Sequence, residues 1–179
     1  PIQFLRGRVR GEEVGLPILS WGDMEKTLGD FKLKTGEGEV RSAEVVGVVG
    51  PNATGKTTMV LGLVRAIKSL NLNVTLCAPT GKAAKRLGEA TGLQKFNPST
   101  VHRYLENIKM FDVLIVDEAS MLDMDLFQSL LATIPDGKQL VLIGDKDQLP
   151  PVGSGQPFKD IIEFLGWHND PTGVTGQST

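Results

Sequence analysis

The sequence has few of the features that define secreted or membrane proteins. It contains one cysteine, Cys77, so no disulfide forms within the chain, and the apolar run around it predicts a small buried side chain. No stretch approaches the roughly 20 apolar residues of a membrane span, and the first residues lack the apolar run of a signal peptide. We therefore expect a cytoplasmic protein with no membrane partner.

An excess of charge of one sign is also missing. The formal net charge of −2 argues against nucleic-acid binding through bulk charge, although it leaves room for a local basic stripe. With 40% hydrophobic and 22% charged residues among 179, the composition is that of a globular protein long enough to bury a core. Composition thus excludes a disordered chain but leaves the function open.

From residue 45 onward, apolar strands alternate with helices. Apolar runs with the length of buried strands occupy residues 45–49, 74–78, 113–116 and 140–143. Segments with helical spacing occupy residues 57–70, 82–89, 100–107, 124–133 and 158–165. This alternation predicts an α/β domain over residues 45–166, in which helices cover both faces of a parallel sheet and ligands bind at the carboxyl ends of the strands.

The two ends of the chain differ from this central part. Residues 1–44 are rich in glycine, and alternating pieces such as 31–34 and 39–41 predict short strands joined by turns. Residues 167–179 are rich in Gly, Pro, Asn and Thr, which predicts an irregular tail. We therefore expect a small β-rich segment, an α/β domain and a tail.

A phosphate-binding loop is the clearest motif. The spacing Gly50-x4-Gly55-Lys56-Thr57 lies between a predicted strand and a predicted helix, which is the context this motif requires. Its backbone N–H groups can turn inward around phosphates, and the helix N-terminus adds positive potential. We expect Lys56 to reach the β- and γ-phosphates of ATP as a catalytic residue, and the Thr57 hydroxyl to bind Mg²⁺. The residues expected to hold the nucleotide are Gly50, Pro51, Asn52, Ala53, Thr54, Gly55, Lys56, Thr57 and Thr58.

Two acids follow the apolar strand at residues 113–116. Asp117 is suited to the Mg²⁺ shell, and Glu118 to polarising the attacking water. An unpaired carboxylate near a core is costly, which favours a functional role. The alternative is a solvated acid pair at the start of a helix. Together with the loop, the pair predicts hydrolysis of ATP as well as binding.

Four further segments resemble those of a known family. They are Cys-Ala-Pro-Thr-Gly-Lys-Ala-Ala-Lys-Arg-Leu at 77–87, Ser-Thr-Val-His-Arg at 99–103, Asp-Val-Leu-Ile-Val-Asp-Glu-Ala-Ser-Met at 112–121 and Val-Leu-Ile-Gly-Asp-Lys-Asp-Gln-Leu-Pro-Pro-Val at 141–152. In order and spacing they resemble motifs Ia, Thr-x-His, II and III of RecD-type superfamily 1 DNA helicases over about residues 50–158. The resemblance implies a P-loop NTPase with the fold of the first RecA-like motor domain, which hydrolyses ATP in response to single-stranded DNA.

The same resemblance assigns roles to further residues. It implies that Gln148 senses the γ-phosphate and couples it to DNA. It places along the DNA path Pro79, Thr80, Lys82, Thr100, His102 and Arg103. Independently of the resemblance, Lys82, Lys85 and Arg86 put positive charge on the helix after a strand's carboxyl end, which suits backbone phosphates. The alternatives are a solvated helix face for Lys85 and Arg86, a structural histidine for His102 and a rigid Leu-Pro-Pro loop for Gln148. Asp145 and Asp147 are expected to brace that loop.

The sequence departs from the helicase pattern in two respects. The family uses arginines from a second RecA-like domain, and no arginine follows Arg103, so we expect no unaided unwinding and a second motor domain or partner chain that supplies an arginine. The upstream glutamine that reads adenine is absent, since none occurs between Gln3 and Gln94. Trp21 or Phe31 could stack on the base instead, although burial is the alternative.

The N-terminal part resembles a different family. Residues 23–33, 38–40 and 44–52 are similar to the start of the second nucleotide-binding domain of the ribosome-recycling ABC ATPase, over about residues 20–58. The ABC signature Leu-Ser-Gly-Gly-Gln is absent, and so is a switch histidine after the fourth predicted strand. One hypothesis is a recombined or designed chimera joined at the phosphate loop, and the alternative is a single lineage with a chance likeness.

Three functions therefore stay open at the level of the sequence. The first is a DNA-stimulated ATPase, supported by the motifs between residues 50 and 158. The second is an ATP-binding module with negligible turnover, because the arginine of a second domain is missing. The third is a folded scaffold that has lost a competent nucleotide site.

Overall fold

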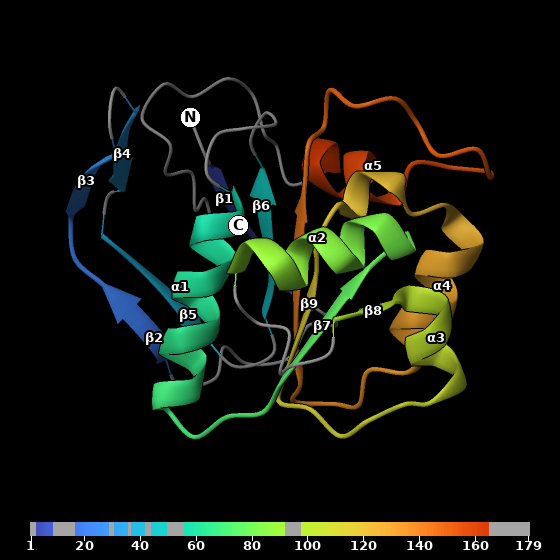
Figure 1. Cartoon of the computed structure of the whole chain (residues 1–179), viewed down its shortest axis with the longest axis horizontal. Coiled ribbons are helices and arrows are strands. Elements are labelled where there is room, and N and C mark those ends of the chain that lie inside the picture. Colours follow the sequence, from blue (N-terminus) through green and yellow to red (C-terminus); the bar gives the residue numbers. More distant parts are fainter. Residues whose placement is uncertain are drawn as a thin grey trace.

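The computed structural model describes residues 3–8, 17–28, 31–35, 37–41, 44–49, 56–91 and 98–164. Its centre is a six-stranded sheet (Figure 1). In spatial order the strands are β1 (Gln3–Arg8), β6 (Glu44–Val49), β10 (Gln139–Gly144), β9 (Val113–Val116), β7 (Val74–Ala78) and β8 (Ser99–Thr100).

Five neighbouring strands of this sheet run parallel. β6 pairs with β10, β10 with β9, β9 with β7 and β7 with β8, all in parallel, whereas β1 pairs antiparallel with β6 at the edge. β10 therefore lies between the strand that precedes the phosphate loop and the strand that ends in the two acids. The chain segment after β10 consequently emerges between those two motifs.

Helices cover both faces of the sheet, as predicted for an α/β fold. α1 (Lys56–Ser69) and α2 (Gly81–Thr91) pack on one face. The short 3-10 helix η2 (Ala119–Met121), α3 (Val101–Glu106), α4 (Met124–Ala132) and α5 (Pro157–Phe164) pack on the other (Figure 1). The predicted ends of the five α-helices and of β6, β7, β9 and β10 differ from the observed ones by at most two residues, whereas η2 and β8 were not predicted.

Alternation along the central strands explains this three-layer packing. In β9, Val113 and Ile115 join the core beneath α1 and α2, while Leu114 and Val116 join the core beneath α3, α4 and α5. Successive side chains of a strand point to opposite faces, so four consecutive apolar residues are buried on both sides. Each fully buried aliphatic side chain contributes about 1.5–3 kcal/mol relative to an exposed one.

The N-terminal part contains two antiparallel strand pairs, which confirms the β-rich segment. β2 (Pro17–Trp21) pairs with β5 (Gly38–Arg41), and β3 (Met24–Leu28) pairs with β4 (Phe31–Thr35). The membership of β1 in the central sheet was not predicted, since its pairing with β6 joins segments far apart in the sequence. The boundaries at 1–44, 45–166 and 167–179 stay predictions, and residues 167–179 lie outside the described part.

Cys77 is a buried residue of β7, as the sequence predicted. Its side chain is fully buried, and its Sγ lies 3.8 Å from the Ser99 hydroxyl. Burial raises the pKa of the Cys77 thiol to about 11, which keeps it protonated and unreactive at neutral pH. Within the described ranges, no helix has the length and apolar character needed to cross a bilayer.

A carboxylate joins the amino ends of three strands. Asp112 accepts the Asn73 backbone N–H at 2.8 Å and the Lys138 ammonium at 2.9 Å. The backbone N–H groups of Asp112 and Val113 donate to the Asn73 carbonyl, and that of Gln139 donates to the Asp112 carbonyl. The Asn73 N–H, with Lys138 beside it, holds the pKa of Asp112 below its ordinary value of 3.8. The charged carboxylate therefore stabilises the starts of β7, β9 and β10.

Glycine is required at the carboxyl end of β10. A Cβ built on Gly144 would lie 2.8 Å from two ring carbons of Phe158 and 3.0 Å from the Ser120 backbone nitrogen. Phe158 is only 3% exposed, so its ring has little room to move. The absence of a side chain at Gly144 thus lets β10, η2 and α5 approach closely.

Asp112→Asn is expected to lower the free energy of unfolding by roughly 1 kcal/mol at pH 7, because a partly exposed charged hydrogen bond to Lys138 is lost. Because the folded-state pKa is lowered, the contribution of Asp112 is fully present above its unfolded pKa. It disappears as the pH falls through the folded value. Urea unfolding at pH 7, 4 and 3 measures it, with Glu106→Gln, an exposed site, as the control. A difference from wild type that does not change with pH would contradict this role.

Gly144→Ala is expected to lower the free energy of unfolding by about 1–3 kcal/mol, because the new methyl group overpacks Phe158 and η2. The matched control is Gly62→Ala in α1, where no atom lies within 4 Å of the added Cβ. That exposed helical site should instead become about 0.5–1 kcal/mol more stable. Urea unfolding of the two variants gives both values, and equal shifts in one direction would refute the packing argument.

Candidate functional site

The two acids lie at a sharp turn of the backbone after β9. Asp117 continues the sheet by donating its N–H to the Cys77 carbonyl at 2.9 Å. Glu118 then adopts a left-handed conformation with φ 54° and ψ 37°, which costs a non-glycine residue on the order of 1 kcal/mol. The Asp117 carboxylate accepts the Glu118 N–H at 2.9 Å and so stabilises this turn. Both side chains are half-buried at the carboxyl edge of the sheet.

Gln148 brings its side chain to the second of these acids. Its Nε2 donates to Glu118 Oε2 at 3.1 Å, and its Oε1 accepts the Ser120 hydroxyl at 3.0 Å. The structure thus places together Glu118 and Gln148, which the sequence predicted as catalytic residues. It adds Ser120, which sequence reasoning missed. The available signal was its place two residues after Glu118, within the segment that resembles helicase motif II.

Asp145 holds the loop that carries Gln148, as expected. Its carboxylate accepts the Asp147 N–H at 3.1 Å, and its carbonyl accepts the Gln148 N–H at 3.2 Å. Asp145 is 8% exposed, so its carboxylate is largely removed from water. The loop after β10 therefore begins with a fixed turn from which the Gln148 side chain extends.

The phosphate loop starts from a neighbouring position of the sheet. Gly144 pairs with Val49, the last residue of β6, and Leu142 pairs with Val116, the last residue of β9. Residues 50–55 lie outside the described part, as do the side chains of 56–58, which form the first turn of α1. The sheet nevertheless fixes where the three segments leave it, with the Gln148 loop in the middle.

Asp117 fits the chemistry of a Mg²⁺ site at this edge. Mg²⁺ prefers oxygen ligands and is often held by one or two carboxylates together with nucleotide phosphates. Within the described residues, no group of three His, Cys, Asp or Glu side chains gathers to form a complete protein cage. A site that combines Asp117 with a hydroxyl and phosphates needs no such group. The assignment of Mg²⁺ to Asp117 and Thr57 stays a prediction.

The residues predicted along a DNA path lie at the ends of two adjacent strands. β7 and β8 are parallel, and Ala78 pairs with Thr100. The structure therefore brings to one edge the two groups that the sequence predicted, namely Pro79, Thr80 and Lys82 after β7, and Thr100, His102 and Arg103 after β8. Their contact with DNA stays a prediction.

Two of these residues have structural roles that the sequence analysis missed. The Thr80 hydroxyl accepts the Ala83 N–H, and the Thr100 hydroxyl accepts the Arg103 N–H, both at 3.2 Å. These bonds cap the first turns of α2 and α3, and loss of such a cap costs about 1 kcal/mol. A variant at either threonine would therefore change stability as well as any ligand contact.

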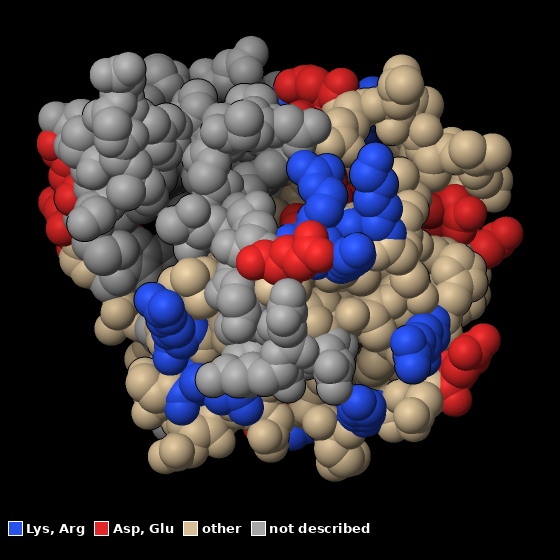
Figure 2. All heavy atoms as spheres, viewed as in Figure 1, with Lys and Arg blue, Asp and Glu red and all other residues tan. Residues whose placement is uncertain are grey.

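A basic stripe follows α2. Lys82, Lys85 and Arg86 are exposed on this helix, and Figure 2 shows Lys and Arg side chains gathered over it. Lys85 lies 3.7 Å from Glu89 one turn further on, so part of its charge is balanced within the helix. A local basic surface, which a net charge of −2 permits, is therefore present on α2.

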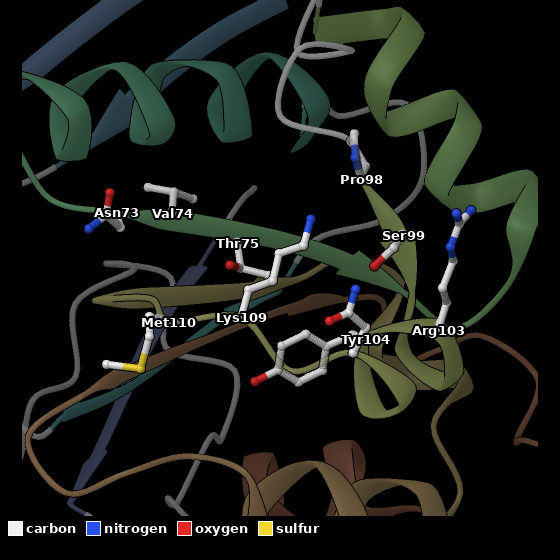
Figure 3. Close-up of a pocket in the computed structure, with 10 residues that line it drawn as sticks. Asn73, Val74, Thr75, Pro98, Ser99, Arg103, Tyr104, Lys109 and Met110 are labelled. Atoms are coloured by element: carbon white, nitrogen blue, oxygen red, sulfur yellow. The ribbon is translucent and has the colours of Figure 1, made fainter.

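A cavity of about 490 Å³ lies between β7, β8, α3 and the segment after α3 (Figure 3). Its lining is mostly polar and consists of Asn73, Val74, Thr75, Pro98, Ser99, Arg103, Tyr104, Asn107, Lys109 and Met110. Neither the acid pair nor Gln148 lines it. Arg103 is the single member of the predicted DNA set on its wall, so the cavity borders that set but is separate from the acid pair.

The side chains of Trp21 and Phe31, the predicted alternatives for stacking on a base, lie outside the described part. Their backbones belong to β2 and β4, respectively. Stacking on adenine therefore stays a prediction.

Comparison with known proteins identifies the family. The AAA domain family matches residues 38–167. The ATP-dependent RecD2 DNA helicase of Deinococcus radiodurans is 46% identical over 130 residues, which cover 66% of this chain and 18% of that protein. The ATP-dependent DNA helicase dda of Enterobacteria phage T4 is 37% identical over 140 residues, which cover 67% of this chain and 31% of that protein. The chain spans less than a third of either relative.

A solved structure addresses the second resemblance. The complex of the archaeal ribosomal stalk protein aP1 with the archaeal ribosome recycling factor aABCE1 matches 79% of this chain and 36% of its own, at 17% identity and a TM-score of 0.45. A likeness of this level carries no argument, so the ABC-like beginning and the chimera stay predictions. The resemblance to RecD-type helicases is confirmed, and the chain belongs to the AAA domain family.

Proposed function

We propose that this chain binds Mg·ATP and hydrolyses it in response to single-stranded DNA, as the first motor domain of a RecD-like helicase. The observation that carries the proposal is the 3.1 Å contact between Gln148 Nε2 and Glu118 Oε2. It joins the two loops that leave the sheet nearest to the phosphate loop. The relatives of this chain that are named ATP-dependent DNA helicases support the same proposal.

Each residue of this edge has a task in the proposed reaction. Lys56, at the start of α1, holds the phosphates together with the backbone of the loop before it. Glu118, half-buried and hydrogen-bonded to Gln148, accepts the proton of the attacking water. Asp117 and Thr57 would hold Mg²⁺, which would supply charge neutralisation on the transferred phosphoryl group.

Single-stranded DNA is the proposed partner of the edge formed by β7 and β8. Lys82, His102 and Arg103 are exposed there, and the basic stripe on α2 continues the same surface (Figure 2). Positively charged grooves that follow the backbone are how proteins bind single strands without reading sequence. The Gln148 loop provides the link from this surface to the nucleotide.

Unwinding itself is proposed to need a second motor domain or a partner chain. The relatives are more than three times as long as the part that this chain matches. An arginine supplied by another domain raises turnover by about 10³–10⁵ in phosphoryl transfer. We therefore propose slow hydrolysis by the chain alone.

Lys56→Ala is expected to abolish ATP binding, while Glu118→Gln should retain binding and lower turnover about 10²–10⁴-fold. Titration calorimetry measures binding, and phosphate release with and without single-stranded DNA measures turnover. Wild-type turnover no faster than Glu118→Gln would favour a binding module. Absence of ATP binding by the wild type would favour a scaffold.

Lys82→Ala and Arg103→Ala are each expected to weaken single-stranded DNA binding, because each removes a cation from the proposed path. The slope of log affinity against log salt should fall by about 0.7 per lost phosphate contact. Fluorescence anisotropy at several salt concentrations measures this slope. Lys159→Ala is the control, since this exposed lysine lies 3.9 Å from Glu163 on α5, a helix that packs against η2. An equal loss of DNA affinity in Lys159→Ala would indicate that binding depends on the overall charge and not on the proposed path.

A further inference from the structure

Three half-buried polar side chains from two segments meet at the carboxyl edge of the sheet. Glu118 and Ser120 come from the turn and the 3-10 helix after β9, and Gln148 comes from the loop after β10. The Ser120 hydroxyl lies 3.0 Å from Gln148 Oε1, and Gln148 Nε2 lies 3.1 Å from Glu118 Oε2. The amide of Gln148 is thus held at both of its ends.

The chemistry of these groups permits one orientation of the amide. An ionised carboxylate only accepts hydrogen bonds, so Glu118 requires the NH₂ end of Gln148. The carbonyl end then faces Ser120, whose hydroxyl can donate to it. The bonds run in one direction, from hydroxyl to amide and from amide to carboxylate, and each polarises the next. Rotation of the amide by half a turn would set its oxygen against the carboxylate.

The backbone around Ser120 is fixed independently of this contact. η2 is closed by the Met121 N–H on the Glu118 carbonyl at 3.0 Å and by the Leu122 N–H on the Ala119 carbonyl at 3.1 Å. The Ser120 backbone nitrogen also lies against Gly144, where even a methyl group would not fit without displacement. The hydroxyl is therefore presented to Gln148 from a rigid support.

We propose that Ser120 is a positioning residue that orients the Gln148 amide so that its NH₂ group faces Glu118. This inference rests on the proposed function, in which Glu118 accepts a proton and Gln148 responds to the nucleotide. Loss of the hydroxyl removes this donor from the amide oxygen and with it a contact that favours the present orientation of the amide. Glu118 then loses a fixed hydrogen-bond donor, although nothing that grips the nucleotide has changed.

Nuclear magnetic resonance of the Gln148 side-chain NH₂ group tests the contact without any need for turnover. The pair of signals is assigned by its loss in Gln148→Ala. Ser120→Ala is expected to shift this pair of signals, and Ser120→Thr, which keeps a hydroxyl, to restore it. Ser129→Ala is the control, because the Ser129 hydroxyl donates to the Asp125 carbonyl on α4. Unchanged Gln148 signals in Ser120→Ala would overturn the proposal.

The rate of ATP hydrolysis tests whether the orientation of the Gln148 amide matters for catalysis. Ser120→Ala is expected to lower kcat for ATP about tenfold, the value of one hydrogen bond, with an unchanged Kd for ATP and an unchanged unfolding midpoint. The double variant Ser120→Ala/Gln148→Ala should be no slower than Gln148→Ala alone, because both act through one amide. Additive losses would overturn the positioning role. Absence of wild-type turnover would instead refute the proposed function, and the magnetic resonance result would still decide the contact.

Discussion

The placement of β10 between β6 and β9 is the constraint on which the candidate site depends. Parallel pairing on both sides of β10 sets its last residue, Gly144, beside Val49 and within two residues of the pairing partner of Val116. The three segments that leave the sheet at this edge are therefore neighbours. This pairing is stabilised from both faces, because alternate residues of β10 join the two cores.

Because Gly144 has no side chain, α5 and η2 approach the end of β10 closely, and this approach brings side chains of the site into contact. Without a Cβ, β10 lets the aromatic ring of Phe158 and the backbone of Ser120 pack directly against its end. η2 therefore sits where the Ser120 hydroxyl reaches Gln148, and Gln148 reaches Glu118. The strained left-handed backbone of Glu118 fits the same arrangement, since a sharp turn after β9 is needed to start η2 beside β10.

Local sequence patterns were sufficient for most of the central domain. The apolar runs of β7 and β9 and the helical spacing of Val60, Val64 and Ile67 in α1 predict elements whose ends agree with the structure to within two residues. The acids after β9 were also found, because carboxyl ends of parallel strands are where such folds place ligands. The glutamine after β10 was found through the resemblance to motif III of RecD-type helicases. Ser120 was missed, because its importance lies in a partner 28 residues away.

The sequence by itself determined the α/β class, the bounds of the five α-helices and of β6, β7, β9 and β10, and the identity of the chemical groups, because these follow from periodicity and residue type within short windows. Only the tertiary structure decided the order of the strands and the entry of β1 into the central sheet. It also decided that the amide of Gln148 lies between Ser120 and Glu118. These features depend on contacts between segments distant along the chain, and no local pattern of residues records such distances.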